Sequence, residues 1–369
     1  MKNNILLDNI IFCLQEIGGI SNYWFNLLNK FVKEDSIFFY MDSKAEKNVY
    51  GKLLTLPENR CIDDKSKIPL RIKRYLPVNK IKKIYGFDIF HSSYYRYSQD
   101  DVKNITTVHD FMYEKFLSKY NVRRVIHNRQ KYFALKNSVY IIGISKNTLD
   151  DMMKYFPEFK GKKKQVVWHG VSNDFYVVND KKPFLKIQNQ KIYYNSYYFY
   201  LGNRQGYKNF IFLLRAYARL IKNVPDCPKL LVAGGGNFTD IENRIINELG
   251  INETVIKLNN VNQEELNYIY NHCTGFVYPS LYEGFGMPVL EAMKAGCPVI
   301  CSNTSSLPEV AGEAAIYFNP NNVEDLEKSL YNLLDLNTRK ELIKKGLENV
   351  KKFTWENTCK KTLEVYDSV

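Results

Sequence analysis

The residues best suited to chemistry lie in the stretch from Tyr278 to Ile300, which reads YPSLYEGFGMPVLEAMKAGCPVI. An apolar run ends near Pro279, and Gly284 and Gly286 then allow the backbone to approach a ligand closely. Pro288 stands where the first residue of a helix is expected. The unpaired amides at the start of that helix, including those of the segment from Gly284 through Phe285 and Gly286 to Met287, predict an anion-binding site.

Two carboxylates flank this turn. Glu283 precedes it and Glu291 lies one turn into the expected helix, so both side chains are expected to face the same ligand. Carboxylates next to a phosphate site suit neutral polyols, with a sugar on one and the diol of a ribose on the other. A Glu-x7-Glu spacing alone occurs by chance in many proteins, so its weight comes from the strand, glycine loop and helix around it.

A pair of cations follows another apolar run. Arg204 and Lys208 are four residues apart in LGNRQGYKN, so both can reach one pyrophosphate. Arg supplies a planar fork of donors and Lys a compact point charge. The alternative is a solvated start of a helix.

Two further candidates lie in the first half of the chain. Gly18-Gly19 ends an apolar run and opens a helical pattern, which leaves amides for a phosphate or an acceptor hydroxyl, or marks a tight turn with positive φ. His109 ends an apolar strand, where an active-site group is expected, although a buried structural histidine is the alternative. His91 and His169 also follow strands, and we expect both to be structural.

The elements that must position these residues alternate between apolar strands and periodic helices. Strands are expected at 5–14, 37–41, 88–91, 105–109, 139–145 and 165–168, and again at 198–202, 229–233, 254–258, 275–279 and 298–302. Helices with one apolar face are expected at 20–32, after a Ser145 cap, and at 208–220. The alternation predicts an α/β fold with two doubly wound domains, joined by the polar segment 179–191. Ligands should bind beyond the carboxyl ends of the strands, in the cleft between the domains.

Composition agrees with a folded chain of about two domains. The 369 residues are 45% hydrophobic and 25% charged, with no apolar run long enough to span a bilayer. Asp8 and Asn9 interrupt the first apolar stretch, which favours a buried strand over a signal peptide. Seven scattered cysteines without a CxxC pair indicate neither a disulfide framework nor a zinc site, and favour a reducing cytoplasm.

The positive charge is concentrated in the first half. Residues 1–200 hold 34 basic and 19 acidic residues, a net charge of +15, whereas 201–369 hold 18 and 20. The segment 65–84 interleaves eight cations with bulky apolar residues, which is typical of a peripheral contact with an anionic membrane and is also compatible with a solvated surface. Since no helix-turn-helix, zinc-finger or RNA-recognition signature occurs, no nucleic-acid partner is expected.

Taken with its strand and helix context, the stretch 278–300 resembles the signature of the family-4 retaining glycosyltransferases of the GT-B type. Further segments are similar to this family: 11–23 with Gly18-Gly19, Val108-His109-Asp110, 144–148, 169–171, Leu201–Asn209, 305–310 and 353–355. The first of these is closest to the branch of O-polysaccharide mannosyltransferases.

The resemblance implies an acceptor-binding domain at 1–180, a nucleotide-sugar domain at 192–350, and a last helix at 351–369 that packs back on the first domain. It implies a hexosyltransferase that retains anomeric configuration and adds sugar to an O-antigen or capsule glycan, with a polyprenyl-diphosphate-linked acceptor at the inner face of the cytoplasmic membrane. Among donors it favours GDP-mannose over UDP-hexoses. Arg204 and Lys208 would bind the diphosphate, Glu291 the ribose, Glu283 and the amides of 284–287 the sugar, and His109 would line the reaction centre with Gly18 and Gly19.

No Asp-x-Asp motif occurs in the chain, so no metal is expected to hold the diphosphate, and no other cofactor is expected. The charge of the leaving group would then be balanced by cations and helix amides. Two other functions share this architecture: a sugar-nucleotide epimerase or phosphorylase, and a non-catalytic membrane-associated scaffold of polysaccharide assembly.

Overall fold

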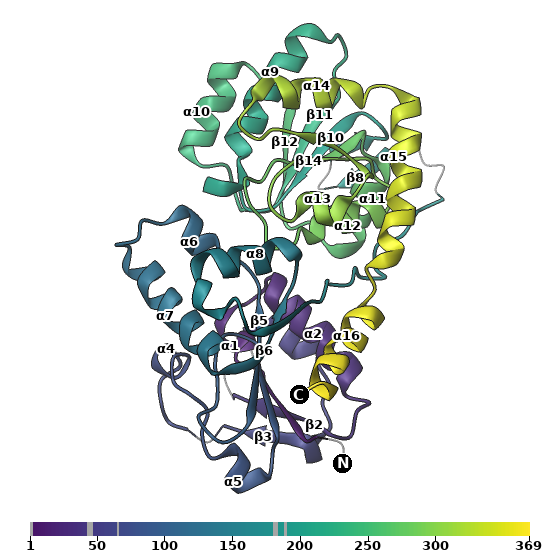
Figure 1. Cartoon of the computed structure of the whole chain (residues 1–369). Coiled ribbons are helices and arrows are strands. Elements are labelled where there is room, and N and C mark those ends of the chain that lie inside the picture. Colours follow the sequence, from purple (N-terminus) through teal and green to yellow (C-terminus); the bar gives the residue numbers. More distant parts are fainter. Residues whose placement is uncertain (1–2, 43–46, 65, 180–183, 188–189) are drawn as a thin grey trace. The chain divides into compact units, whose positions relative to one another are not determined.

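The computed structural model describes residues 3–42, 47–64, 66–179, 184–187 and 190–369. The chain divides into two compact units, one of Met1–Gly170 with Trp355–Val369 and one of Val171–Thr354 (Figure 1). The units therefore divide at Gly170 and Thr354, not at 180 and 350 as the sequence suggested. The cleft expected between the two domains stays a prediction.

The first unit is built on a seven-stranded parallel sheet in the order β3-β2-β1-β4-β5-β6-β7. Its strands are β1 (Ile5–Asp8), β2 (Ile37–Met41), β3 (Cys61–Asp63), β4 (Ile89–Ser92), β5 (Lys103–Val108), β6 (Ser138–Gly143) and β7 (Lys163–Val166). Its helices are α1 (Ile11–Leu14), α2 (Gly19–Phe31), α3 (Val49–Leu53), α4 (Leu70–Lys73), α5 (Ile81–Tyr85), α6 (Met112–Phe116), α7 (Val122–Asn137) and α8 (Lys146–Tyr155).

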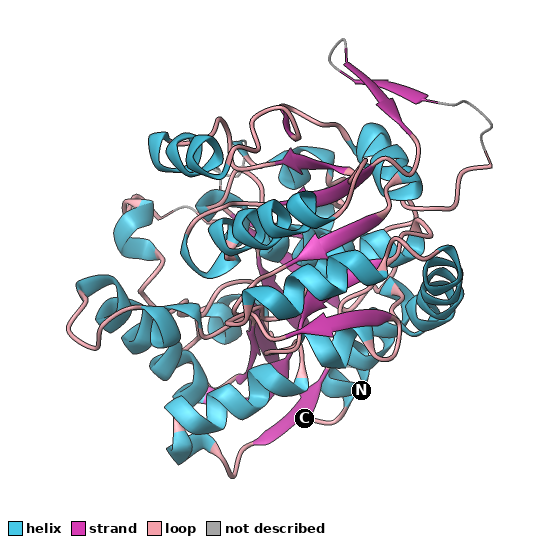
Figure 2. Cartoon of the chain, turned by 90° about the horizontal axis from the view of Figure 1, so that it is seen from above, coloured by secondary structure: helices cyan, strands magenta, loops and turns pink. Residues whose placement is uncertain are grey.

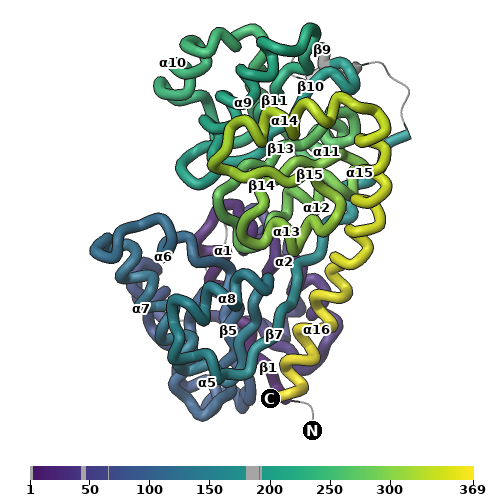
Figure 3. Tube along the Cα trace, turned by 45° about the horizontal axis from the view of Figure 1, so that its top comes forward, coloured from purple at the N-terminus to yellow at the C-terminus, as the bar shows by residue number. Residues whose placement is uncertain are grey.

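The helix α16 (Trp355–Asp367) belongs to this first unit, although it follows the whole second unit in sequence. It lies beside α2, as Figure 3 shows. The Lys30 ammonium contacts the Glu356 carboxylate at 2.6 Å, and the rings of Phe31 and Tyr366 lie 6.0 Å apart. The chain thus begins and ends in one unit.

The second unit holds a six-stranded parallel sheet in the order β12-β11-β10-β13-β14-β15. Its strands are β10 (Tyr197–Leu201), β11 (Lys229–Ala233), β12 (Val255–Leu258), β13 (Gly275–Tyr278), β14 (Val299–Ser302) and β15 (Ala315–Phe318). Its helices are α9 (Phe210–Asn223), α10 (Asp240–Leu249), α11 (Gln263–His272), α12 (Met287–Lys294), α13 (Leu307–Ala311), α14 (Val323–Asn332) and α15 (Leu336–Asn349). Strands and helices alternate in both units (Figure 2), which confirms the α/β, doubly wound fold.

Buried apolar faces hold these layers together. The apolar stripe of α9, with Phe210, Leu213 and Tyr217 fully buried, packs on Tyr198 and Val232 of the central strands. At about 25 cal/mol per Å² of apolar area removed from water, such stripes supply most of the folding free energy. Ser145 caps α8 by accepting a hydrogen bond from the amide of Thr148 at 3.0 Å, as predicted.

The elements differ from the expectation in three places. The strand expected at 5–14 ends at Asp8, because its carboxylate accepts the Ile10 amide at 3.2 Å and the chain turns into α1. The short strands β3 and β15 were not anticipated. The polar segment 179–191 contains β8 (Phe184–Ile187) and the first half of β9 (Gln190–Tyr193), which pair in antiparallel orientation, whereas 180–183 and 188–189 lie outside the described residues.

All seven cysteines are free thiols, and four of them are buried. Within the described residues, no helix combines the length and apolar character needed to cross a bilayer.

Candidate functional site

The second unit has one point where the direction of strand addition reverses. The chain builds outward from β10 through β11 to β12, then returns to place β13 on the other side of β10. Loops after two such neighbouring parallel strands diverge, which opens a crevice at their carboxyl ends where ligands of this fold class bind. The loop after β10 carries Lys208 and the loop after β13 carries Glu283.

Lys208 and Glu283 form an ion pair across this point. The Lys208 ammonium lies 2.6 Å from Oε1 of Glu283 and 3.2 Å from the hydroxyl of Tyr278, the last residue of β13. Both charged side chains are largely buried, with 15% and 13% of their surface exposed. Burial alone would lower the pKa of Lys208, but the Glu283 carboxylate outweighs it and raises that pKa well above the ordinary value. Lys208 is therefore a permanent cation.

The glycine turn after Glu283 leads directly into α12. Gly286 caps the helix with φ at 108°, a conformation that favours glycine, and a Cβ at this position would lie 2.8 Å from Leu307. The helix begins at Met287, so Pro288 is its second residue, whereas the sequence suggested that it is the first. Pro288 has no N–H and the Val289 amide donates to the Gly286 carbonyl at 3.0 Å, so the Met287 amide is the first-turn donor that α12 offers to the predicted anion site, at the positive end of the helix dipole.

Three hydroxyl groups hold this turn in place, and the sequence did not reveal them. They follow β14: Thr304 donates to the Leu281 carbonyl at 3.1 Å, Ser305 accepts from the Glu283 amide at 3.0 Å, and Ser306 donates to the carbonyls of Glu283 and Phe285 at 3.0 and 2.8 Å. In the sequence, residues 305–306 are recognisable only as part of the segment 305–310, which is similar to the glycosyltransferase family. Its role depends on β13 and β14 being neighbours, which the sequence alone does not state.

Glu291 is the fifth of the eight residues of α12 and is partly exposed. Burial raises the pKa of this carboxyl to about 7. No hydrogen bond to the Glu291 carboxylate forms among the described residues. Burial, and to a lesser extent the negative charge of Glu291, raises the pKa of the Tyr270 phenol. A carboxylate that is costly to ionise and has no partner is suited to accept hydroxyl groups of a ligand.

Arg204 is placed differently from the expectation. Its Nε donates to Glu242 at 2.9 Å, its Nη1 donates to the Gly234 carbonyl, and its Nη2 donates to three carbonyls of residues 235–237 at 2.6 to 3.2 Å. The guanidinium also lies 5.1 Å from the centre of the Phe238 ring. Arg204 thus holds the glycine loop between β11 and α10, so only Lys208 of the predicted cation pair contacts Glu283. The role of Arg204 on a diphosphate stays a prediction.

In the first unit, Gly18 and Gly19 form the start of α2. Gly18 is the cap with extended backbone at φ 172°, so the alternative of a tight turn with positive φ is wrong. A Cβ on Gly18 would meet the Gln15 side chain at 2.6 Å, whereas one on Gly19 would meet nothing within 4 Å. The open space beside Gly19 is compatible with a ligand at the helix start.

His109 directly follows β5 and is buried between Tyr23 and Tyr95, with ring centres 5.6 and 6.5 Å away. Burial and the nearby ammonium of Lys131 lower the pKa of His109 to about 3, so the imidazole is neutral at physiological pH. Lys131, which has no exposed surface, donates to the Asp110 carbonyl at 2.8 Å and to the Glu114 carboxylate at 2.7 Å. This buried ion pair fixes the turn after His109 and was missed in the sequence.

Two further histidines, His91 and His169, occupy packed positions. His91 lies between the hydroxyls of Tyr366 and Thr107, at 2.7 and 2.8 Å. His169 stacks on the ring of Tyr23, with centres 4.5 Å apart. Both arrangements agree with the structural roles expected of them.

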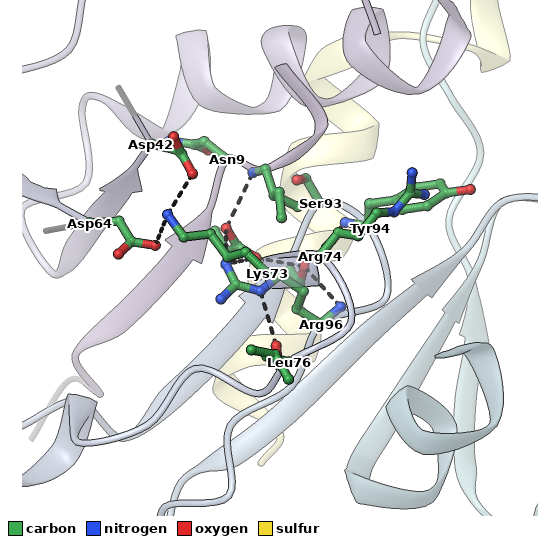
Figure 4. A network of polar contacts seen from close by, with 12 residues as sticks. Asn9, Asp42, Asp64, Lys73, Arg74, Leu76, Ser93, Tyr94 and Arg96 are labelled. Carbon is green, nitrogen blue, oxygen red and sulfur yellow. Dashed lines mark hydrogen bonds and ion pairs between the residues drawn. The ribbon is translucent and has the colours of Figure 1, made fainter. Parts of the chain in front are cut away.

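The basic segment contributes fewer surface cations than its sequence suggested. Lys73 is buried between the carboxylates of Asp42 and Asp64, at 2.7 Å from each (Figure 4). Ile72, Tyr75 and other apolar side chains of the segment are exposed. Lys65 lies outside the described residues.

Across the described parts of the chain, no group of three or more His, Cys, Asp or Glu side chains is arranged to hold a metal ion. The structure brings together Lys208, Glu283 and the turn at 284–287 within the second unit. Gly18, Gly19 and His109 belong to the first unit.

Comparison with known proteins identifies the second unit. Residues 181–349 match the family model of glycosyl transferases group 1. O-antigen chain mannosyltransferase B of Escherichia coli is 28% identical over 335 residues, which cover 88% of this chain and 84% of that protein. The serotype-specific mannosyltransferase WbdA of Escherichia coli is 28% identical over 273 residues, 71% of this chain but only 33% of WbdA.

Solved structures share the fold over the whole chain. Sucrose-phosphate synthase from Thermosynechococcus elongatus has a TM-score of 0.74 at 19% identity, covering 100% of this chain and 99% of that one. HepE from Anabaena, solved with UDP and glucose, has a TM-score of 0.71 at 14% identity, with both chains fully covered. Residues 181–349 are therefore similar to the group 1 glycosyl transferases, and the chain is a glycosyltransferase with the GT-B fold, similar to O-antigen mannosyltransferases.

Proposed function

We propose that this enzyme transfers a hexose from a nucleotide-diphosphate sugar to a growing glycan of the bacterial surface. The observation that carries the proposal is the buried Lys208–Glu283 pair at the point where strand order reverses, next to the glycine-capped start of α12. A fixed cation and a helix N-terminus on one side of a carboxylate suit a ligand that is anionic at one end and a polyol at the other.

For the donor, we assign the diphosphate to the Lys208 ammonium and to the Met287 amide at the start of α12. Glu283 accepts hydroxyls of the donor sugar, with the amides of 284–287 beside it, and Glu291 accepts the ribose diol. Arg204 supports this site by holding the loop 234–237, and it reaches the diphosphate only if that loop exchanges some of its carbonyl contacts.

The reaction is a substitution at the anomeric carbon. An acceptor hydroxyl forms the new carbon–oxygen bond, the bond from the anomeric carbon to the β-phosphate oxygen breaks, and the hydroxyl proton passes to that phosphate oxygen. Attack on the face that the diphosphate leaves retains the anomeric configuration. Charge builds up on the leaving diphosphate, where Lys208 and the Met287 amide stabilise it, and we propose that no metal ion is needed.

The acceptor is assigned to the first unit, with Gly18 and Gly19 at the start of α2 and His109 after β5. Because His109 is neutral, it can orient a hydroxyl by a hydrogen bond without adding charge to the site. We propose GDP-mannose as the donor ahead of UDP-hexoses, since the two relatives described above are mannosyltransferases.

We further propose a lipid-diphosphate-linked acceptor at the inner face of the cytoplasmic membrane. Support comes from the segment 66–84, where exposed Ile72, Tyr75 and Leu76 lie next to exposed Arg71. Each cation near an anionic surface contributes about 1 kcal/mol. Vesicles containing phosphatidylglycerol should retain the protein at low salt, and a failure to sediment with them contradicts membrane association.

The test of the function is turnover of a panel of nucleotide sugars in the presence of EDTA, followed by product analysis. Transfer, or slow hydrolysis without acceptor, is expected for one donor, with loss of at least about 100-fold in Lys208→Met, because a charge-assisted contact made in the transition state is removed. An epimerised nucleotide sugar or a phosphorolysis product identifies the sugar-nucleotide enzymes instead. Absence of turnover with every donor contradicts the proposal and favours a scaffold.

A further inference from the structure

The first unit contains a cavity of about 440 Å³ that none of the roles above uses. It lies between the chain after α4, the loop after β4 and the helix α7, and its walls include Tyr75, Tyr97 and Phe133. Its volume falls in the range of ligand sites of proteins. From its lining we propose that this cavity is a subsite for pyranose residues of the acceptor glycan, an inference that rests on the proposed glycosyltransferase function.

The strongest indication comes from Gln130, a residue of the cavity lining whose side chain has an unpaired acceptor. Gln130 lines the cavity and is 6% exposed. Its Nε2 donates to the Arg74 carbonyl at 2.8 Å, which fixes the orientation of the amide. Its Oε1 is buried and accepts no hydrogen bond from any described residue. A buried carbonyl oxygen without a donor costs free energy, so the site favours a ligand that brings a donor, such as a sugar hydroxyl.

Donors also line the cavity. Arg96 is buried, and its Nε donates to the Leu76 carbonyl at 3.3 Å (Figure 4), while its Nη1 contacts Asp8 at 3.5 Å. Its Nη2 donates no hydrogen bond among the described residues. Arg129 at the rim of the cavity lies over Phe133, 5.7 Å from the ring centre. An acceptor and two guanidinium groups around one cavity match the donor and acceptor character of vicinal hydroxyls.

The remaining surface of the cavity is aromatic. The rings of Tyr97 and Phe133 are nearly parallel, at 21°, with centres 6.3 Å apart, and Tyr75 and Leu76 complete the apolar side. Planar apolar surfaces next to hydrogen-bonding side chains suit the apolar face and the hydroxyl edge of a pyranose ring. An ionised phosphate group has no proton to donate to Oε1 of Gln130, and an isoprenoid chain has no hydrogen-bond donor either, so both would leave this oxygen unpaired.

The cavity is connected to the proposed acceptor side of the site by Tyr95. This residue lines the cavity, and its hydroxyl accepts the backbone N–H of His109 at 3.3 Å. Its backbone has φ at 51°, a left-handed conformation that is uncommon for an aromatic residue and that concentrates at functional positions. Sugars already present in the acceptor would thus be held one side chain away from His109.

The experiment measures binding of mannotriose, maltotriose and chitotriose to the full chain without donor, by saturation-transfer NMR. At least one saccharide should give a signal that is lost in Gln130→Met and in Phe133→Leu and kept in Arg123→Gln, an exposed residue of α7 outside the cavity lining. Thermal unfolding verifies that each variant folds. Farnesyl phosphate is measured alongside as a probe for the lipid part of an acceptor. If no saccharide gives a signal that these variants lose, or if farnesyl phosphate alone gives one, the glycan subsite is refuted.

A kinetic measurement separates this subsite from the proposed function. With an acceptor of three or more sugars, Gln130→Met should raise the KM for the acceptor about tenfold, the loss expected for one buried hydrogen bond, without a matching rise in the KM for the donor. Turnover with an unchanged acceptor KM refutes the subsite alone. Saccharide binding by a chain that turns over no nucleotide sugar refutes the proposed function and leaves the subsite standing.

Discussion

Replacement of Glu291 by glutamine should make the protein more stable and its donor binding weaker. The burial that raises the pKa of this carboxyl from 4.5 to about 7 also penalises its ionised form in the folded state. Glutamine has nearly the same shape and no charge, so Glu291→Gln removes this penalty. It also removes the charged acceptor that we assign to the ribose diol.

The size of the effect follows from the pKa. An interval from 4.5 to about 7, at about 1.4 kcal/mol per pKa unit, corresponds to about 3 kcal/mol. Because the side chain is partly exposed, solvent screening reduces this figure, and we expect about 1.5 kcal/mol. Below about pH 4.5 the carboxyl is protonated in both the folded and the unfolded chain, so wild type and variant should be equally stable. As the pH rises towards 7 the wild type loses stability relative to the variant, and above 7 the difference is constant.

The assay is urea denaturation of wild type and Glu291→Gln between pH 4.5 and 8, with Glu264→Gln, an exposed glutamate of α11, as the control. The KM for the donor, measured at pH 8, should rise about tenfold in Glu291→Gln, because charged acceptors form the stronger hydrogen bonds. For the same reason wild-type donor binding should tighten as the pH rises through 7. A variant that is no more stable than wild type at pH 8, or whose stability difference does not depend on pH, refutes the reasoning.

Three further predictions concern the same unit. Glu283→Gln should lower the free energy of unfolding by about 3–5 kcal/mol, because it leaves the buried Lys208 ammonium without a counter-charge. In urea denaturation, the double variant Glu283→Gln/Lys208→Met should be more stable than this single variant. Ser306→Ala should lower the free energy of unfolding by about 1–2 kcal/mol and raise the KM for the donor, because it releases the turn at 283–285. Ser302→Ala, which removes a buried hydroxyl without a partner, should leave the free energy of unfolding nearly unchanged. Gly235→Ala should lower the melting temperature, because φ is +69° and the new Cβ would lie 2.8 Å from a guanidinium nitrogen; an unchanged melting temperature contradicts the placement of this loop.

The fold could be predicted from the sequence because its strands are nearly continuous apolar runs. The strand at 229–233 agrees in both bounds, and most others agree within two or three residues. Long apolar runs are typical of strands that are covered on both faces. The edge strands β3 and β15 were missed because they are three and four residues long and only partly buried, so they carry little apolar signal.

The candidate site could be predicted only as far as topology allows. Lys208 and Glu283 are 75 residues apart, yet both follow apolar strands, and the rule for parallel sheets places both at one edge. It could not be predicted from the sequence that the guanidinium of Arg204 donates its hydrogen bonds to the carbonyls of the loop 234–237. That outcome depends on the close approach of a glycine loop to the end of β10, a contact between segments about 30 residues apart.

The central claim is that this chain binds the diphosphate of a nucleotide sugar with Lys208 and the start of α12, without a metal ion. The most direct measurement is calorimetric titration of GDP and UDP into wild type and Lys208→Met in the presence of EDTA. We expect one nucleotide to bind wild type and to lose at least about 100-fold in affinity in the variant, as for a charge-assisted contact that is removed from a buried site. Equal affinity in both proteins, or binding to wild type only when magnesium or manganese replaces EDTA, would contradict the account.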